Sequence, residues 1–551
     1  MSETRQTQVL IIGAGPVGLT LAAELASRGI HSLIIETRRP AEAPNVRCNH
    51  VASRSMEIFR RLGVAGKLRQ AGLPDDYPND VSYRTTTIGQ EITRILIPGR
   101  ATRFTDTSGP DGWWPTPEPP HRINQLYLEP ILFEHVAQIP LVQIMNRCRF
   151  ESVEQQDDGV LAKIRNLDSD EQFTVAAQYM VGCDGGKSVV RKAIGAQFFG
   201  DAIVQRVQST WIEAPDLITK MVAPPAWAMF SLNPRRSGNL YAIDGKQSWL
   251  IHNYLRDDEP DFDSVDRDWA IRQILGVDEQ FSYRVISKED WIGRRLIADK
   301  FREDHIFLAG DAAHIWVPYG GYGMNAGIAD ASNLGWVLAA RLNGWGSDGI
   351  LNAYEAERLS ITEQVSRFAM DHSAKMASRR RQVPDNIEAT GAQADASRHA
   401  FGQDVYDLNV QQYCCAGLNF GYYYDNSPII VADNATAPDY TMGSYTESTV
   451  PGCRLPHRWL DNGRSLYDEL GPGYTLVVTQ PGLNPSGLTA QADLTGMPIH
   501  IVDLSDQSPD LRLDYAVIMV RTDQHIAWRG HALPADTAGL VRLLATLSGK
   551  N

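Results

Sequence analysis

The chain has 551 residues, of which 43% are apolar and 21% charged, and this composition excludes both a single small binding module and a largely disordered chain. The 52 basic and 66 acidic residues give a net charge of −14, which disfavours nucleic acid as a partner because a nucleic-acid binder needs a basic face. No apolar run approaches the roughly 18 residues of a membrane span, the N-terminus is polar, and the six cysteines form no CxxC pair. We therefore expect a cytoplasmic protein with no membrane association and no metal site.

The N-terminal segment has the pattern of a strand–helix–strand unit. An apolar run at residues 9–12 is followed by a glycine turn, an amphipathic pattern from about residue 16 to 28, and a second apolar run at residues 32–35. We therefore expect a βαβ unit, in which a crossover helix joins two strands.

A GxGxxG motif, Gly13, Gly15 and Gly18, stands between the first strand and the helix, which is the context that a dinucleotide fingerprint requires. Its glycines permit the tight turn, let the backbone approach a pyrophosphate, and let helix and strand pack closely. Glu36, at the end of the second strand, is placed to accept hydrogen bonds from a ribose. NAD and FAD both fit this description, and Arg38 is compatible even with a 2′-phosphate, so the motif leaves the dinucleotide open.

Two later segments narrow the choice of dinucleotide. Residues 304–342 predict an apolar strand that ends at Asp311, a glycine-rich loop, and a helix that begins near Gly323. An Asp at a strand end can accept a hydrogen bond from a polyol hydroxyl, and the N-terminus of such a helix suits the anionic charge of a reduced flavin. In residues 181–195, Asp184 follows a short strand and precedes another helix.

The remaining segments divide the chain into three blocks. Short alternating segments indicate an antiparallel sheet that interrupts the nucleotide-type domain. The domains expected on these grounds are residues 1–80, 104–197 and 285–400 for the nucleotide domain, 81–103 and 198–284 for the sheet, and 404–551 for a third block with its own strands.

A long helix is expected from residue 353 to about Arg379, where three consecutive arginines stand. We interpret Arg379, Arg380 and Arg381 as a solvated face near a helix C-terminus. The polar residues 382–403 that follow are interpreted as a linker or a frayed helix.

These motifs, in this order, resemble those of the class A flavoprotein monooxygenases, the aromatic hydroxylases of the p-hydroxybenzoate, phenol and hydroxyphenylpropionate hydroxylase type. That family has three fingerprints, which correspond here to the GxGxxG with Glu36, a DG motif in CDGGKSVVR (183–191), and a GD motif in GDAAHIWVPYGGYGMNAGIAD (310–330). The resemblance continues in GYYYDNSPII (421–430), PGCRLPHRWL (451–460) and AVIMVRTDQHIAWRG (516–530), which look like the thioredoxin-like C-terminal domain of the phenol hydroxylase branch. It therefore covers nearly the whole chain.

The resemblance implies an α/β fold: a Rossmann-like FAD-binding domain interrupted by an antiparallel β-sheet substrate domain, plus a C-terminal thioredoxin-like α/β domain. The last domain lacks CxxC, so dithiol chemistry is not expected there. The motif and the resemblance together predict that the following residues bind FAD: Gly13, Gly15, Pro16, Val17, Gly18, Glu36, Arg38, Arg47, Gln125, Asp184, Gly310, Asp311, Pro318, Gly321, Gly323, Met324 and Asn325.

The function that the resemblance implies is an FAD-dependent monooxygenase with tightly bound, non-covalent FAD. NADPH or NADH is expected as a transient co-substrate, and O2 as the oxidant, with hydroxylation of a small phenolic or polycyclic aromatic substrate through a flavin C4a-hydroperoxide. Assembly as a homodimer is compatible with the sequence. Three alternatives stay open: a Baeyer–Villiger or epoxidising flavin monooxygenase, a pyridine-nucleotide dehydrogenase, and a non-catalytic flavoprotein.

Four residues are candidates for contact with the substrate. His50 lies three residues beyond Arg47, where related phenol hydroxylases place a polar substrate contact. Period-two alternation puts His252 and Tyr254 on one face of a strand, and Tyr241 lies on the neighbouring strand. A general base or hydrogen-bond acceptor near the phenolic oxygen would assist oxygen transfer. For each of the four, an ordinary loop or sheet role is the competing interpretation.

Overall fold

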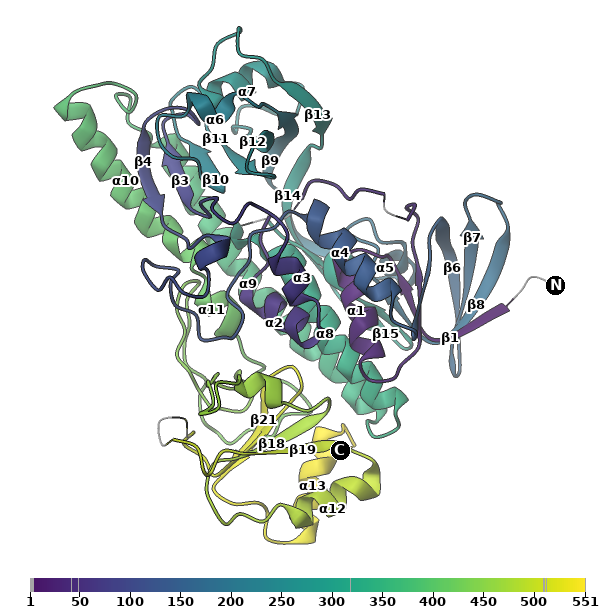
Figure 1. Cartoon of the computed structure of the whole chain (residues 1–551). Helices are drawn as coiled ribbons and strands as arrows, with labels where there is room; N and C mark the ends of the chain where they lie inside the picture. The colour runs from purple at the N-terminus through teal and green to yellow at the C-terminus, as the bar shows by residue number, and fades with distance from the viewer. Residues whose placement is uncertain are drawn as a thin grey trace.

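The computed structural model of the chain describes residues 4–40, 42–47, 49–317, 319–508, 511 and 513–550. Within these residues the strands form an eight-stranded, a nine-stranded and a four-stranded sheet. Figure 1 shows the nine-stranded sheet at the top of the view, the eight-stranded sheet below it on the right, and the four-stranded sheet at the bottom.

The eight-stranded sheet has the order β15-β16-β8-β1-β2-β5, with β6 and β7 added as a hairpin beside β8. Strands β16, β8, β1, β2 and β5 run parallel, and α1 connects β1 to β2 as expected. The strands are β1 (Thr4–Ile12), β2 (Ser32–Ile35), β5 (Val142–Met145), β6 (Cys148–Gln156), β7 (Gly159–Asn166), β8 (Gln172–Gly182), β15 (Arg302–Glu303) and β16 (Ile306–Leu308). The helices around it are α1 (Pro16–Ala26), α2 (Ser53–Arg61), α3 (Ala65–Arg69), α4 (Gln125–Ala137), α5 (Val189–Ala193) and α8 (Tyr322–Leu342).

The nine-stranded sheet is mostly antiparallel and is carried by the long strand β9. Its strands are β3 (Val81–Arg84), β4 (Glu91–Ile95), β9 (Phe198–Glu213), β10 (Ala228–Ser231), β11 (Gly238–Ala242), β12 (Ser248–Tyr254), β13 (Arg284–Lys288), β14 (Trp291–Ala298) and β17 (His314–Ile315), with the helices α6 (Leu217–Lys220) and α7 (Arg267–Leu275). The expected boundary at residue 285 was therefore wrong, because β13 and β14 both pair with β9 and belong to this sheet. The 16 residues of β9 offer a long hydrogen-bonding edge that the local pattern of residues 285–298 does not reveal.

The C-terminal sheet has the order β19-β18-β20-β21. Strands β18 and β19 are parallel, β20 pairs antiparallel with β18, and β21 pairs antiparallel with β20, which is a thioredoxin-like arrangement. The elements are β18 (Tyr474–Val478), α12 (Ser486–Thr495), β19 (Ile499–Asp503), β20 (Val517–Val520), β21 (Ile526–Gly530) and α13 (Thr537–Leu547). Tyr474 joins this domain to the nucleotide domain, since its ring centroid lies 6.1 Å from that of Trp336 and 6.2 Å from that of Trp345.

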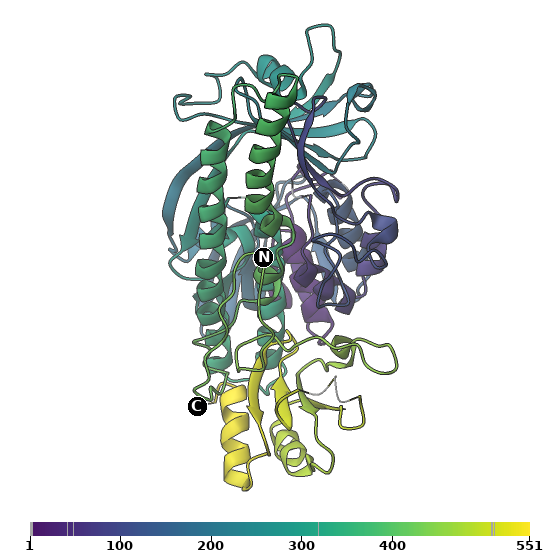
Figure 2. The same cartoon turned by 90° about the vertical axis from the view of Figure 1, so that its left-hand side faces the viewer.

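Two long helices, α9 (Asp348–Arg381) and α10 (Ala392–Tyr413), reach the nine-stranded sheet side by side, as Figure 2 shows, and the short α11 (Ala416–Phe420) follows. The interpretation of residues 382–403 as a linker or frayed helix was wrong for residues 392–403, because α10 begins at residue 392 and crosses the expected boundary at 404. Phe401, Val405 and Tyr413 are buried in the core that contains β4, so packing on the sheet sustains a helix whose local sequence is polar. None of the helices in the described residues combines the length and apolar character needed to cross a bilayer.

Candidate functional site

The strand ends of the eight-stranded sheet bring the three sequence motifs to one edge. Ile12 lies opposite both Ile35 and Gly182, and Leu308 lies opposite Gly182, so β1, β2, β8 and β16 end in step. Each motif begins directly after one of these strands. In an open parallel sheet the ligand binds at this carboxyl edge.

The glycine turn shows which positions serve packing and which leave room for a ligand. A Cβ on Gly13 would lie 2.4 Å from the carbonyl oxygen of Cys183, and a Cβ on Gly18 would lie 2.0 Å from that of Gly13. By contrast, a Cβ on Gly15 would have no described heavy atom within 4 Å, and no side chain caps the helix that begins at Pro16. The backbone at Gly15 is therefore open to a pyrophosphate, as the fingerprint predicts.

Glu36 is oriented by the backbone around it. Its Oε2 accepts a hydrogen bond of 2.8 Å from the Ala14 N–H, and its Oε1 accepts one of 2.9 Å from the Arg38 N–H. Burial raises the pKa of Glu36, but the hydrogen bonds from Arg38 and Ala14 together bring it below its ordinary value. Arg38 also forms a 2.5 Å ion pair with Glu129. An ionised Glu36 at this edge can accept from ribose hydroxyls.

Arg47 and Gln125, which were both predicted to bind FAD, lie beside each other. The carbonyl oxygen of Arg47 accepts a 3.3 Å hydrogen bond from the Gln125 N–H, at the start of α4. The Arg47 side chain is 59% exposed and forms an ion pair with Glu289, from the turn between β13 and β14. Desolvation raises the pKa of Asp311, and the charge of Arg47 is near enough to the GD motif to oppose that rise. Contact of Arg47 with the flavin phosphates stays a prediction.

Asp184 of the DG motif has one oxygen engaged and one available. Its Oδ2 accepts hydrogen bonds from the N–H groups of Val189, at 2.7 Å, and Val190, at 3.2 Å, and so caps α5. Its Oδ1 is buried, and it has no hydrogen-bond partner among the described residues. Buried polar atoms are normally satisfied, so this oxygen fits a ligand hydroxyl.

The GD motif is fixed by a carboxylate that the sequence analysis missed. Asp330 of α8 accepts hydrogen bonds from the Gly310 N–H at 3.0 Å, from His314 Nε2 at 2.6 Å and from Arg358 Nε at 2.7 Å. The sequence did contain a signal for Asp330, which is a single acidic residue directly after AGIA in a mostly apolar helix. Asp311 itself is exposed to solvent, although the protein around it raises its pKa by desolvation. Asp311 is therefore accessible in a desolvated position.

The N-terminus of α8 is tied to the segment that carries His50. Asn325 accepts a 2.8 Å hydrogen bond from the Ala52 N–H and donates 2.6 Å and 3.1 Å hydrogen bonds to the carbonyl oxygens of Gly321 and His50. No side chain caps this helix, and Gly321 has a φ of 62°, which favours glycine. Of the other residues predicted here, Gly323 and Met324 lie in the first turn of α8, Val17 would contact a Cβ on Gly310 at 2.9 Å, and Pro318 lies outside the described residues.

His50 is buried and uncharged. Its pKa is held well below the ordinary value by burial and by the nearby Arg122 and His121. The Arg122 guanidinium donates a hydrogen bond to His50 Nδ1 and lies 4.3 Å from the centroid of the Trp227 ring. Because Nδ1 accepts, the proton of the imidazole lies on Nε2. In this state His50 is a donor and cannot serve as a general base.

The predicted face of β12 looks toward the nucleotide domain. Leu250 on this face packs with Val46, and Tyr241 lies directly opposite Leu250 on β11. The His252 ring lies 5.6 Å from the rings of Tyr241 and Trp291. Burial lowers the pKa of His252 to about 4, and yet His252, Tyr241 and Tyr254 each keep part of their surface exposed. These three side chains thus lie in a desolvated environment and stay partly accessible.

We call these residues, together with the aromatic rings packed beside them, the aromatic cluster. The ring of Trp227 lies 5.4 Å from that of Tyr241 and 6.0 Å from that of Tyr413. Tyr319 completes the group, since it affects the pKa of Tyr241. The aromatic cluster comprises Trp227, Tyr241, His252, Tyr254, Trp291, Tyr319 and Tyr413.

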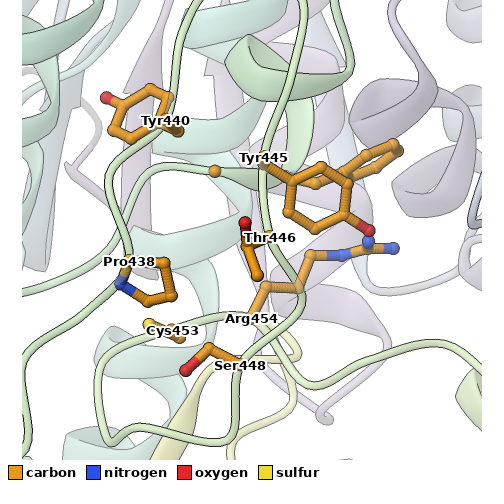
Figure 3. A pocket seen from close by; sticks show the side chains of 9 residues that line it. Pro438, Tyr440, Tyr445, Thr446, Ser448, Cys453 and Arg454 are labelled. Atoms are coloured by element: carbon orange, nitrogen blue, oxygen red, sulfur yellow. The ribbon is translucent and has the colours of Figure 1, made fainter.

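A separate small pocket lies beside the C-terminal domain and contains none of the residues predicted to bind FAD or the substrate. Figure 3 shows Tyr445 beside the side chain of Arg454 at this pocket. Arg454 forms an ion pair with Glu57 of α2, so its charge is satisfied within the protein. The pocket is lined by Phe420, Gly421, Pro438, Tyr440, Tyr445, Thr446, Ser448, Cys453 and Arg454.

Comparison with known proteins shows the family. Residues 6–369 match the family model described as "FAD binding domain", and residues 448–551 match "Aromatic-ring hydroxylase, C-terminal". The chain belongs to the FAD-dependent aromatic-ring hydroxylases. The FAD-dependent monooxygenase apdD of Emericella nidulans is 29% identical over 571 residues, which cover 98% of this chain and 90% of that protein.

Solved structures of this hydroxylase family agree over the whole length. The rebeccamycin biosynthetic enzyme RebC with reduced flavin superposes with a TM-score of 0.89 and 31% identity, with 100% of both chains covered. Aklavinone-11 hydroxylase with FAD and aklavinone gives a TM-score of 0.80 and 25% identity, with 99% of both chains covered. These comparisons confirm the predicted family, fold class, FAD cofactor and monooxygenase activity.

Proposed function

We propose that this monooxygenase uses NADPH or NADH and O2 to hydroxylate a phenolic or polycyclic aromatic compound. In this reaction one oxygen atom of O2 enters a ring C–H bond as hydroxyl, the other leaves as water, and NAD(P)H supplies the two electrons. The observation that carries the proposal is the position of the aromatic cluster, which faces the nucleotide domain through Leu250 and Val46. Aklavinone, which the related hydroxylase binds, supports a polycyclic substrate.

Three features of the site fit FAD: the open backbone at Gly15, the buried Oδ1 of Asp184 and the exposed carboxylate of Asp311. When bound there, the flavin supplies hydride acceptance and oxygen activation. We propose that Glu36 and Arg38 hold the adenosine end, and that the uncapped start of α8 holds the ring system.

The aromatic cluster has two functions in this proposal. Its rings give an aromatic substrate a flat apolar surface, and they exclude water from the reacting atoms. Burial raises the pKa of Tyr241 and Tyr254 well above the ordinary value, so both hydroxyls stay protonated and can donate to a phenolic oxygen. His252 is neutral for the same reason. Tyr241, Tyr254 and His252 are therefore neutral groups that can orient a phenol.

The test is an assay of the purified holoenzyme with a panel of phenols and isotopically labelled O2. We expect bound FAD, substrate-stimulated NAD(P)H oxidation and a product that has gained one labelled oxygen atom as a ring hydroxyl. A labelled lactone or epoxide would support the alternative oxygenation instead. Absence of FAD would favour a dehydrogenase, and FAD without stimulated oxidation would favour a non-catalytic flavoprotein.

Replacing His50 by alanine should lower the yield of product per NAD(P)H several-fold while FAD content stays close to that of the wild type. The reason is that the His50 side chain accepts from Arg122, which lies over Trp227, whereas its link to Asn325 is made by the backbone carbonyl, which alanine keeps. Product and NAD(P)H consumption measured together give the ratio. His50→Gln should restore much of it, because the amide oxygen can accept from Arg122. An unchanged ratio in His50→Ala would remove His50 from the site.

We further propose that the enzyme works in the cytoplasm and forms a homodimer. Cell fractionation tests the first statement. Light scattering of the purified protein tests the second, with a mass of twice 61.1 kDa as the expected result.

A further inference from the structure

The three consecutive arginines at the end of α9 have different surroundings. Arg379 lies 3.3 Å from a carboxylate oxygen of Asp404, and Arg381 lies 3.6 Å from one of Asp257. Within the ranges that the structure describes, no carboxylate lies within 4.0 Å of Arg380. The interpretation of the triplet as a uniform solvated face was therefore wrong for its middle residue.

Arg380 is built into the aromatic cluster. Its Nη2 donates a 2.5 Å hydrogen bond to the Tyr319 hydroxyl, and its guanidinium carbon lies 3.9 Å from the centroid of the Tyr254 ring. The hydrogen bond to Tyr319 fixes one N–H group of the guanidinium, and the contact with the Tyr254 ring fixes the orientation of the guanidinium plane. The side chain stays partly exposed, so its remaining donors can be reached.

Tyr254 does not neutralise this charge. Burial raises the pKa of Tyr254 well above its ordinary value, and the nearby Tyr319 and Tyr241 raise it further. The hydroxyl of Tyr319 accepts a hydrogen bond from Arg380. Arg380 is thus an oriented cation that has no carboxylate partner among the described residues. It lies at the site where the aromatic substrate is proposed to bind.

Resting on the proposed function, we propose that Arg380 binds a carboxylate of the substrate, so that the substrate class is an aromatic acid. A guanidinium presents parallel N–H donors that match the two oxygens of a carboxylate. The tyrosine contacts fix this fork before the ligand arrives, which lowers the entropy lost on binding. Arg122 adds a second positive charge to the cluster, but its guanidinium is buried: one nitrogen donates to His50, and Nη2 has no hydrogen-bond partner among the described residues.

The test compares ligands that carry a carboxylate with their neutral methyl esters. A hydroxynaphthoic acid and its methyl ester are titrated into the FAD-loaded protein, and binding is followed by the change in flavin absorbance. Substrate-stimulated NAD(P)H oxidation and product mass are measured for the same pairs. For the wild type we expect tighter binding of the acid than of the ester.

Arg380→Gln should weaken binding of the acid about 10- to 100-fold, chiefly through Kd and KM, and leave binding of the ester unchanged. Arg380→Lys should recover part of the loss. Arg379→Gln and Arg381→Gln are matched controls with the same change of charge on the same helix, and both should bind the acid like the wild type. A thermal melt of each variant checks folding.

The outcomes separate this inference from the proposed function. Equal loss of acid and ester binding in Arg380→Gln would show that Arg380 merely holds Tyr319, and would overturn the inference while hydroxylation stands. Wild-type binding of the acid by Arg380→Gln would overturn it too. Arg380-dependent binding of the acid with no oxygenated product would support the inference and contradict the proposed reaction.

Discussion

Replacing Gly15 by valine is expected to weaken FAD binding about 100-fold or more without unfolding the protein. Gly15 has extended backbone angles, φ −75° and ψ 178°, that valine also adopts, and an added Cβ would meet no described atom within 4 Å. The side chain would instead fill the space beside the uncapped start of α1, where the pyrophosphate is proposed to bind. The loss of two charge-assisted hydrogen bonds accounts for the expected size. The measurement is the Kd of FAD for the apoprotein.

Two other glycines provide controls for this result. Gly66 in α3 also has no described neighbour within 4 Å of an added Cβ, so Gly66→Ala should keep both FAD affinity and stability. Gly18→Ala should destabilise the fold itself, because its Cβ would overlap the carbonyl of Gly13. Retention of wild-type FAD affinity by Gly15→Val would contradict the assignment of this turn to the pyrophosphate.

Replacing Arg521 by methionine is expected to destabilise the docked C-terminal domain by about 3–5 kcal/mol. Arg521 is fully buried and forms ion pairs of 2.5 Å with Glu357 of α9 and 2.7 Å with Asp523. Its removal leaves two buried carboxylates without this cation. Burial raises the pKa of Asp523, but Arg521 and His525 hold it below the ordinary value, so this loss should shrink as the pH falls and Asp523 takes up a proton.

The measurement for Arg521→Met is the free energy of unfolding in denaturant, with limited proteolysis to show which domain is released. Arg542→Met, on the exposed surface of α13, removes the same charge without a buried partner and should change stability by less than about 0.5 kcal/mol. If both variants unfold at the wild-type midpoint, the buried ion pairs add nothing to docking.

The parts of the fold that were predicted correctly depend on local patterns. The βαβ unit at the N-terminus could be predicted because its apolar runs and glycines are close in sequence. Helix α10 was missed because its apolar residues, such as Phe401 and Val405, are sparse and gain their burial from the distant strand β4. The end of the nine-stranded sheet was missed for a related reason, since β13 and β14 find their partner in β9, far away in sequence.

The same distinction holds for the site. The glycine turn, Glu36, Asp184 and Asp311 follow strands directly, so sequence motifs locate them. Asp330 and Arg380 form hydrogen bonds with residues of other elements, Gly310 and Tyr319. A local sequence pattern does not show which distant residues pair in this way. A charge inside an apolar helix was a usable signal for Asp330. Arg380 could not be singled out in the sequence, because arginines stand on both sides of it and only the structure shows that its surroundings differ from theirs.

Helix α9 connects two regions that are otherwise far apart. Near its start, Glu357 is clamped by the C-terminal domain, and near its end Arg380 touches the aromatic cluster. At 1.5 Å per residue, roughly 35 Å of continuous helix separates them. A small tilt imposed at the clamped end becomes a larger displacement at the other. The thioredoxin-like domain is remote from the reaction, and yet it can affect selectivity for the substrate. Substitutions in its docking surface can move Arg380 without changing any group that contacts the substrate.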